Sequence, residues 1–318
     1  MIIKSFWAMK NIRSKRAFAL SIVLWISAAL MAVALYSITV TKQSVQNAKL
    51  LDAKLRSKLD VESAFEKVLF YLSSSRFWEN SASNELEGMP KKIYLDNRVS
   101  YFMLNDSNIT LKVQDIGGIM NVTILGQKLM VTQRLIKLLT GKESLYFRDS
   151  YLDWLDPDEK RYLNGAESFY YHSKHRVYGS ANNRYIEHPD ELRLIRGFDT
   201  LSDEEWKRLR KYFAYSYSGS RNLMAFPDVM IKAFLDLTSD EWEELMAIKK
   251  KNIEKYRDKF LSHIADDEQR ERMYFHPTRS FVIKLKADNK GTVSRITATA
   301  DLKPKVETMI NIIEFRNK

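Results

Sequence analysis

The sequence predicts an α+β protein, in which a long N-terminal helix is followed by a β-sheet that a helical insertion interrupts. Three observations predict this class. An uncharged apolar run lies near the start, an amphipathic pattern continues it without glycine or proline as far as Gly88, and strand patterns occur only on either side of a helical middle. With 318 residues, of which 45% are hydrophobic, the chain is long enough to bury a substantial core.

The first expected element is a membrane-spanning helix. Residues 17–41 carry no charge, and this run is longer than the roughly 20 residues that a spanning helix needs and the roughly 7–15 of a secretory signal. A cleaved signal peptide is therefore disfavoured. The preceding residues contain no acid and five cations, so the positive-inside rule predicts a cytoplasmic N-terminus and places the chain after Lys42 across the membrane. These cations are Lys4, Lys10, Arg13, Lys15 and Arg16.

The helix is expected to continue to about Ser74, which gives a length of roughly 85 Å from Ala17 at 1.5 Å per residue. Apolar residues recur mostly three or four positions apart, with polar neighbours between them. This apolar face needs a partner later in the chain, although a plain anchor with a coiled-coil neck is the alternative. The face comprises Val45, Ala48, Leu51, Leu55, Phe65, Val68 and Leu72.

Strand patterns follow the helix and return near the C-terminal end. Within residues 98–122, Ile109, Leu111 and Val113 alternate with polar residues, and a Gly-Gly turn separates them from the next apolar pair. Residues 280–302 form a predicted hairpin, with "DNKG" as its turn. Because these strands flank a helical middle, we expect one sheet interrupted by an insertion.

The middle, from about residue 126 to 275, is expected to be mostly helical. One helix should begin after Ser202, with Glu205 in the position of a capping box. A second should begin at Thr238 or Ser239 and continue without interruption to about residue 261.

The composition excludes several classes of function. Five of the charges behind the net charge of +11 lie before the apolar run and the others are dispersed, so no nucleic-acid partner is expected. The chain has no cysteine, which excludes disulfides, thiol nucleophiles and iron–sulfur clusters. It also lacks G-x-S-x-G, H-E-x-x-H and a glycine-rich phosphate loop, so no enzyme is expected. A membrane-anchored periplasmic hydrolase using "DWLDPD", and a single-pass sensor, are the alternatives.

The segment "DWLDPD" is the candidate metal site. Asp153, Asp156 and Asp158 present several hard oxygen ligands within six residues, a pattern that suits calcium. The alternative is helix capping and solvation around Pro157, because Asp-Pro favours a turn.

Three motifs resemble the minor pseudopilin K family (GspK) of bacterial type II secretion systems. They are a D-W-x-D-x-D run, a Gly-Ala-Glu before aromatic residues, and an Asn and a Pro followed by an acidic E-L-R-L-x-x-G stretch. The start "RAFALSIVLW" also resembles the family. In this sequence the motifs are Asp153, Trp154, Asp156 and Asp158; Gly165, Ala166 and Glu167; and Asn182, Pro189, Glu191, Leu192, Arg193, Leu194 and Gly197.

The resemblance implies a pilin-like fold: a long N-terminal helix, partly transmembrane, on an antiparallel sheet with a large inserted α-helical domain. It implies a non-catalytic role as a minor pseudopilin in a periplasmic pseudopilus for protein export. The expected partners are the I-type and J-type minor pseudopilins, the major pseudopilin, prepilin peptidase and the inner membrane. The family is also associated with calcium in the inserted domain.

The resemblance assigns roles to the N-terminal residues. Prepilin peptidase would cut between Ala17 and Phe18, although the family normally has glycine before the cut. Pilin-like subunits generally carry glutamate at the fifth mature position, which is Ile22 here. A subunit without that carboxylate cannot pair with the N-terminal amine of a preceding subunit, so we expect this chain at the pseudopilus tip, where assembly begins.

These inferences give an expected organisation in five parts. They are a cytoplasmic leader (1–17), a transmembrane helix (18–41), the pilin-like helix with the first strands (42–125), the inserted helical domain (126–275) and the returning strands (276–318). The part after the membrane would lie in the periplasm.

Overall fold

A computed structural model describes residues 3–143, 145–180, 185–215, 222–264, 270, 275–302 and 310–317. The chain divides into two compact units, residues 1–56 and residues 57–318. The described part of the first unit is entirely helical and belongs to α1 (Ile3–Ser74). By length and composition, α1 is apolar enough to cross a membrane: its best window lies within Leu20–Ser74, has a mean hydropathy of 2.1 and is not buried.

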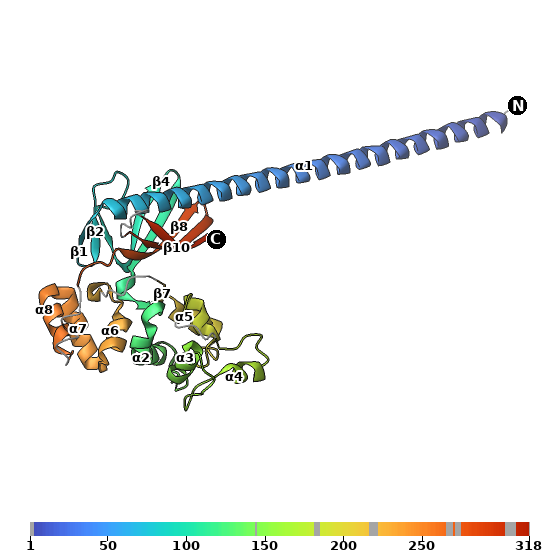
Figure 1. Ribbon diagram of the computed structural model, residues 1–318. Coiled ribbons are helices and arrows are strands. Elements are labelled where there is room, and N and C mark those ends of the chain that lie inside the picture. Colours follow the sequence, from blue (N-terminus) through green and yellow to red (C-terminus); the bar gives the residue numbers. More distant parts are fainter. Residues whose placement is uncertain are drawn as a thin grey trace. The chain divides into compact units, whose positions relative to one another are not determined.

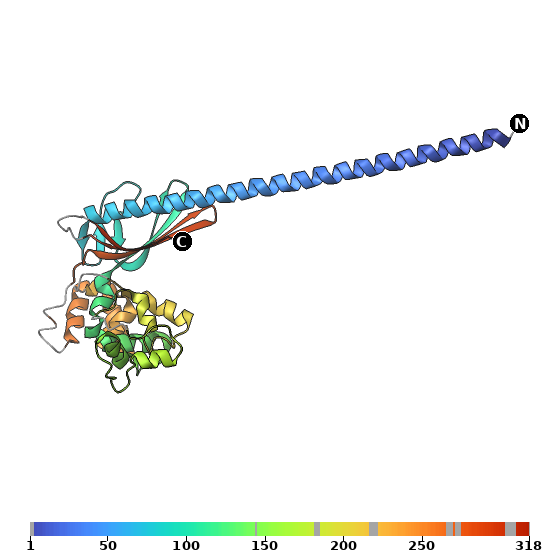
Figure 2. The ribbon, with the colours of Figure 1, turned by 45° about the vertical axis from the view of Figure 1, so that its right-hand side comes forward.

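The second unit contains a five-stranded antiparallel sheet. Its strand order is β10-β9-β8-β5-β4, and residues 57–74 of α1 lie along one of its faces (Figures 1 and 2). The predicted fold class, a long helix on an antiparallel sheet with a helical insertion, is confirmed. The strands are β4 (Asp96–Leu104), β5 (Ser107–Asp115), β8 (Ser280–Asn289), β9 (Thr292–Asp301) and β10 (Asn311–Asn317).

The helix and the sheet share a core built from one face of each. On α1, Phe65, Val68 and Leu72 are buried, as their three- and four-residue spacing predicts, and they pack with inward residues of β5, β8 and β9. Leu51 and Leu55 belong to the predicted face but lie in the first unit, where their exposed fractions are 69% and 55%. Within the second unit, therefore, the sheet covers the C-terminal part of the predicted apolar face.

The hairpin of β8 and β9 has the predicted turn. Asn289 pairs with Thr292, and the two residues between them, Lys290 and Gly291, have φ values of 49° and 87°. Two positive φ angles are typical of a type I′ turn, whose twist matches that of the strands it joins.

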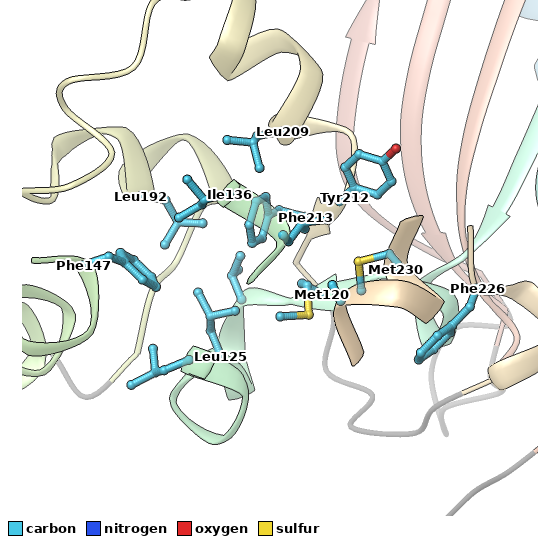
Figure 3. Packing of buried hydrophobic residues seen from close by; sticks show 14 of the residues in the cluster. Met120, Leu125, Ile136, Phe147, Leu192, Leu209, Tyr212, Phe213, Phe226 and Met230 are labelled. Carbon is cyan, nitrogen blue, oxygen red and sulfur yellow. The ribbon is translucent and has the colours of Figure 1, made fainter. Parts of the chain in front are cut away.

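The helical insertion separates β5 from β8, although these strands are direct neighbours in the sheet. Its side chains form a second core, which Figure 3 shows in part. The elements are η1 (Ile116–Gly118), β6 (Met120–Asn121), η2 (Val122–Lys128), α2 (Leu129–Thr140), α3 (Phe147–Leu155), α4 (Ser168–Ser173), η3 (Pro189–Leu194), α5 (Asp203–Arg210), β7 (Phe213–Ala214), η4 (Leu223–Ala225), α6 (Asp228–Leu235), α7 (Ser239–Lys251) and α8 (Ile253–Ser262). A small sheet of β1 (Arg76–Trp78), β2 (Ser81–Ser83) and β3 (Lys92–Tyr94) precedes β4.

Two helices in the insertion begin where the sequence predicts. Ser202 and Glu205 form the predicted capping box at α5, and Thr238, one of the two predicted starts, forms one with Glu241 at α7. The single helix predicted after Thr238 is wrong, because the chain breaks into α7 and α8 at Asn252. This residue has extended backbone angles, and its side chain accepts a hydrogen bond from the Lys255 amide, which caps α8.

A buried carboxylate joins the insertion to the sheet. Asp115, at the end of β5, accepts hydrogen bonds from the Gly117 amide (2.8 Å), the Asn222 side chain (2.9 Å) and both the amide (2.9 Å) and the hydroxyl (2.5 Å) of Thr278. These donors come from η1, the start of η4 and the segment leading into β8. Since both oxygens of Asp115 are satisfied by the chain itself, this carboxylate fixes the chain path where the insertion leaves the sheet and returns to it.

Candidate metal centre

The candidate centre is built on the C-terminal end of α3. Phe147, Tyr151 and Trp154 recur at helical spacing and are buried in the core of the insertion, which fixes the helix in place. This orientation directs Asp153 inward, and its side chain is fully buried. The helix ends at Leu155, because Pro157 disfavours helical geometry at the residue before it.

Three carboxylates converge beside α3. Asp153, Asp156 and Glu167, which precedes α4, each place one oxygen within 4.8 Å of the other two. Asp153 Oδ1 accepts a hydrogen bond from the Tyr162 amide (3.1 Å), and Glu167 Oε2 accepts one from the Ser180 hydroxyl (3.2 Å). These two bonds engage Asp153 Oδ1 and Glu167 Oε2.

One buried oxygen of each carboxylate lacks a donor. Within the described ranges, no hydrogen-bond partner reaches Asp153 Oδ2, Asp156 Oδ1 or Glu167 Oε1. A buried acceptor without a partner is costly, and three neighbouring carboxylates also repel one another. A cation among the three would satisfy all three oxygens, and hard carboxylate oxygens are the ligands that calcium and magnesium prefer.

The pKa values of the cluster reflect this environment. Burial is the largest cause that raises the pKa of Asp153, Asp156 and Glu167, and neighbouring carboxylates raise each of the three further. The pKa of Glu167 reaches about 7, with Asp153 as the main charged neighbour. Without a cation, the cluster therefore holds a proton near neutral pH.

Gly165 is required for the position of Asp153. A Cβ atom at residue 165 would lie 1.8 Å from Asp153 Oδ2, so any side chain there would displace the carboxylate. The Gly-Ala-Glu motif thus has three local roles: Gly165 allows the close approach, Ala166 is buried in the core, and Glu167 adds a carboxylate.

The structure brings together two of the three aspartates predicted from the sequence. Asp158 lies outside the three-residue group: its Oδ1 accepts a hydrogen bond from the Lys160 amide (2.7 Å), and the side chain is exposed. Glu167 was missed as a candidate ligand, although it is part of the Gly-Ala-Glu motif. Fourteen residues separate it from Asp153 in the chain, and only the fold brings the two close.

The other predicted residues have the following places. Glu191, in the Pro189–Leu194 motif segment, accepts a hydrogen bond from the Trp154 indole (2.8 Å) and so supports α3. Phe18 and Ile22 lie on α1, exposed. Asn182 lies outside the described residues, and so does the side chain of Ala17. The cleavage between Ala17 and Phe18 and the assembly role of Ile22 stay predictions.

Comparison with known proteins supports the fold and the resemblance to a known family. Residues 120–215 match the family model "Type II secretion system (T2SS), protein K". This chain resembles one chain in the crystal structure of the GspK–GspI–GspJ complex from the enterotoxigenic Escherichia coli type 2 secretion system. The TM-score is 0.57, the sequence identity is 12%, and the match covers 87% of this chain and 99% of that one. At this identity the structural likeness shows the fold. No curated protein sequence matches. The resemblance to the minor pseudopilin K family is confirmed.

Proposed function

We propose that this chain is a minor pseudopilin at the tip of a type II secretion pseudopilus, where it helps to start assembly with I-type and J-type minor pseudopilins. The observation that carries the proposal is the helical insertion between the adjacent strands β5 and β8. Such a large head repeated along a packed helical fibre would collide with the next turn, whereas at the end of the fibre no subunit lies above it. This role is structural and needs no catalytic group.

Two features of α1 support contact with other pseudopilins. Leu51 and Leu55 lie beyond the uncharged run and are exposed, so a neighbouring helix could bury them. Ile22 replaces the carboxylate that would pair with the amine of a preceding subunit, and a charge in the bilayer is costly unless it is paired. The proposed location is the bacterial inner membrane, crossed once, with a cytoplasmic N-terminus, a leader cut by prepilin peptidase after Ala17, and a periplasmic second unit.

Cysteine cross-linking tests this arrangement, because the natural sequence has no cysteine. Leu51→Cys should cross-link to a cysteine on the first helix of an I-type or J-type pseudopilin. The matched control is Lys49→Cys, which is also exposed but lies on the opposite side of the helix at 100° per residue. Immunogold labelling should mark one end of the filament. Cross-links mainly to the major pseudopilin, with labels along the shaft, would contradict the tip position.

We also propose that the insertion binds calcium through Asp153, Asp156 and Glu167. The three orphaned oxygens support this proposal, and chelation should lower the melting temperature of a fragment containing residues 43–318. Gly165→Ala should abolish the response to calcium by displacing Asp153. Gly126→Ala is the matched control, because its new Cβ would meet Tyr151 at an ordinary 3.8 Å. A melting temperature that calcium leaves unchanged in the natural sequence would exclude the site.

A further inference from the structure

A basic groove lies between the helical insertion and the sheet, on the sheet face opposite α1. It encloses about 560 Å³ and is lined by α5, β7 and the outward side chains of β8, β9 and β10. Among the described residues that line it, seven are Lys or Arg and one, Asp190, is acidic. The seven cations are Arg193, Lys207, Arg210, Lys211, Lys284, Arg295 and Arg316.

The strand register concentrates cations on this face. Lys112 of β5 pairs directly with Lys284 of β8, and Lys284 pairs with Thr297, which pairs with Arg316 of β10. Two residues further along β8, Lys286 pairs with Arg295 of β9. Like charges directly opposite one another destabilise a sheet, so this arrangement has no benefit for the stability of the isolated chain.

Asp190 pairs with Arg316 of β10 but does not neutralise Lys284 of β8 or Arg295 of β9. Asp190 accepts hydrogen bonds from Arg210 (2.6 Å) and Arg316 (2.8 Å), which occupy both of its oxygens and lower its pKa. Within the part of the chain that the structure describes, Lys284 and Arg295 form no hydrogen bond or ion pair. Burial lowers the pKa of Lys284, and repulsion from Lys112, Arg210 and Lys211 lowers it further.

The dimensions of the groove favour an extended ligand over a compact one. Lys284 pairs with Thr297, so Arg295, two residues earlier on β9, is its diagonal neighbour, and the Cβ atoms of such neighbours lie about 7–8 Å apart. Carboxylates two residues apart on an extended peptide are separated by about 7 Å and can reach cations on different strands. Val282, which is partly exposed, also lines the groove and offers an apolar contact to the side chains between the carboxylates.

We propose that this groove binds an extended acidic segment of a partner protein, whose carboxylates pair with Lys284 and Arg295. The proposal rests on the charge complementarity and spacing of the groove and depends neither on calcium nor on the tip position. Binding would remove the repulsion between the strand cations, and it would weaken as salt screens the charges.

A fluorescent peptide of four glutamates alternating with three valines tests the proposal by anisotropy, with the full chain in a non-ionic detergent. The peptide should bind at low salt, and the same peptide with glutamine in place of glutamate should not. Lys284→Gln and Arg295→Gln should each weaken binding about tenfold, as expected for a charge-assisted contact. Lys255→Gln is the matched control, because it removes an equal charge from an exposed position of α8 outside the groove.

Three results would overturn the proposal. The first is that Lys255→Gln weakens peptide binding as much as the groove variants do, and the second is that Lys284→Gln and Arg295→Gln leave peptide binding unchanged. The third is that inorganic phosphate, at an equal concentration of negative charge, displaces the peptide completely, which would indicate a small-anion site. Misfolding is checked separately. Lys284→Gln should melt at or above the temperature of the natural sequence, because it removes a poorly solvated charge among like charges.

Discussion

Two buried carboxylate sites in the second unit differ in how their oxygens are satisfied. Asp115 accepts four hydrogen bonds from donors of its own chain, at the junction of the sheet and the insertion. Asp153, Asp156 and Glu167 each leave one buried oxygen without a donor in the described residues. Burial raises the pKa at both sites, so burial alone does not distinguish them. The two sites differ in their supply of donors: both oxygens of Asp115 accept hydrogen bonds, whereas each carboxylate of the cluster keeps one oxygen without a donor in the described residues.

The largest effect is expected at the complete site. Asp115→Ala should lower the free energy of unfolding by about 3–5 kcal/mol, because it leaves several buried donors without an acceptor. Urea unfolding of the 43–318 fragment measures this loss, which should be the same with and without calcium. Asp106→Ala removes an exposed acid between β4 and β5 and should change stability by less than about 0.5 kcal/mol. A calcium-dependent effect of Asp115→Ala would remove the contrast between the two sites.

The next effect is expected at the incomplete site, with the opposite sign in the absence of metal. Asp153→Asn keeps an acceptor for the Tyr162 amide but removes one of three repelling charges, so the metal-free variant should be at least as stable as the natural sequence. Calcium at 100 times its dissociation constant should add about 2.7 kcal/mol to the natural sequence and little to the variant. Calorimetry with calcium and with chelator compares the two, and a full calcium response in the variant would exclude Asp153 as a ligand.

The response to calcium should also depend on pH. The folded-state pKa of Glu167, about 7, exceeds its ordinary value of 4.5, so the metal-free fold binds this proton more tightly than the unfolded chain does. The stability that comes from this proton is fully present below pH 4.5 and is lost as the pH rises through 7. Calcium needs the carboxylate, so the rise in melting temperature on adding calcium should be larger at pH 8 than at pH 5.5. An equal rise at both pH values would mean that Glu167 does not bind the ion.

The smallest effect is expected at Asp158. Because its side chain is exposed and lies outside the three-residue group, Asp158→Asn should change stability by less than about 0.5 kcal/mol, with or without calcium. Isothermal titration of calcium compares this variant with Asp156→Asn, which should bind calcium far more weakly. If the two variants lose the same affinity, the ligand set suggested by the sequence, with all three aspartates, would be the better description.

Short-range features could be predicted from the sequence because neighbouring residues alone determine them. The end of α1 at Ser74, the type I′ turn between β8 and β9, and the capping boxes at Ser202 and Thr238 are of this kind. The missed break at Asn252 is also local in its chemistry, since asparagine is a favoured N-cap. Charged and apolar residues on both sides of it continue a helical pattern, and this pattern masked the cap.

The sequence by itself determined the long helix, its apolar run, the strands on either side of a helical middle, and two of the clustered carboxylates. Only the tertiary structure brought Glu167 close to Asp153, beside Gly165. It also brought Asp115 donors from residues more than 100 positions later in the chain. Finally, it placed Lys284 and Arg295 along the same groove. The physical reason is that periodicity and capping act within a few residues. Pairing register and core packing bring distant residues together, and no local pattern records which ones will meet.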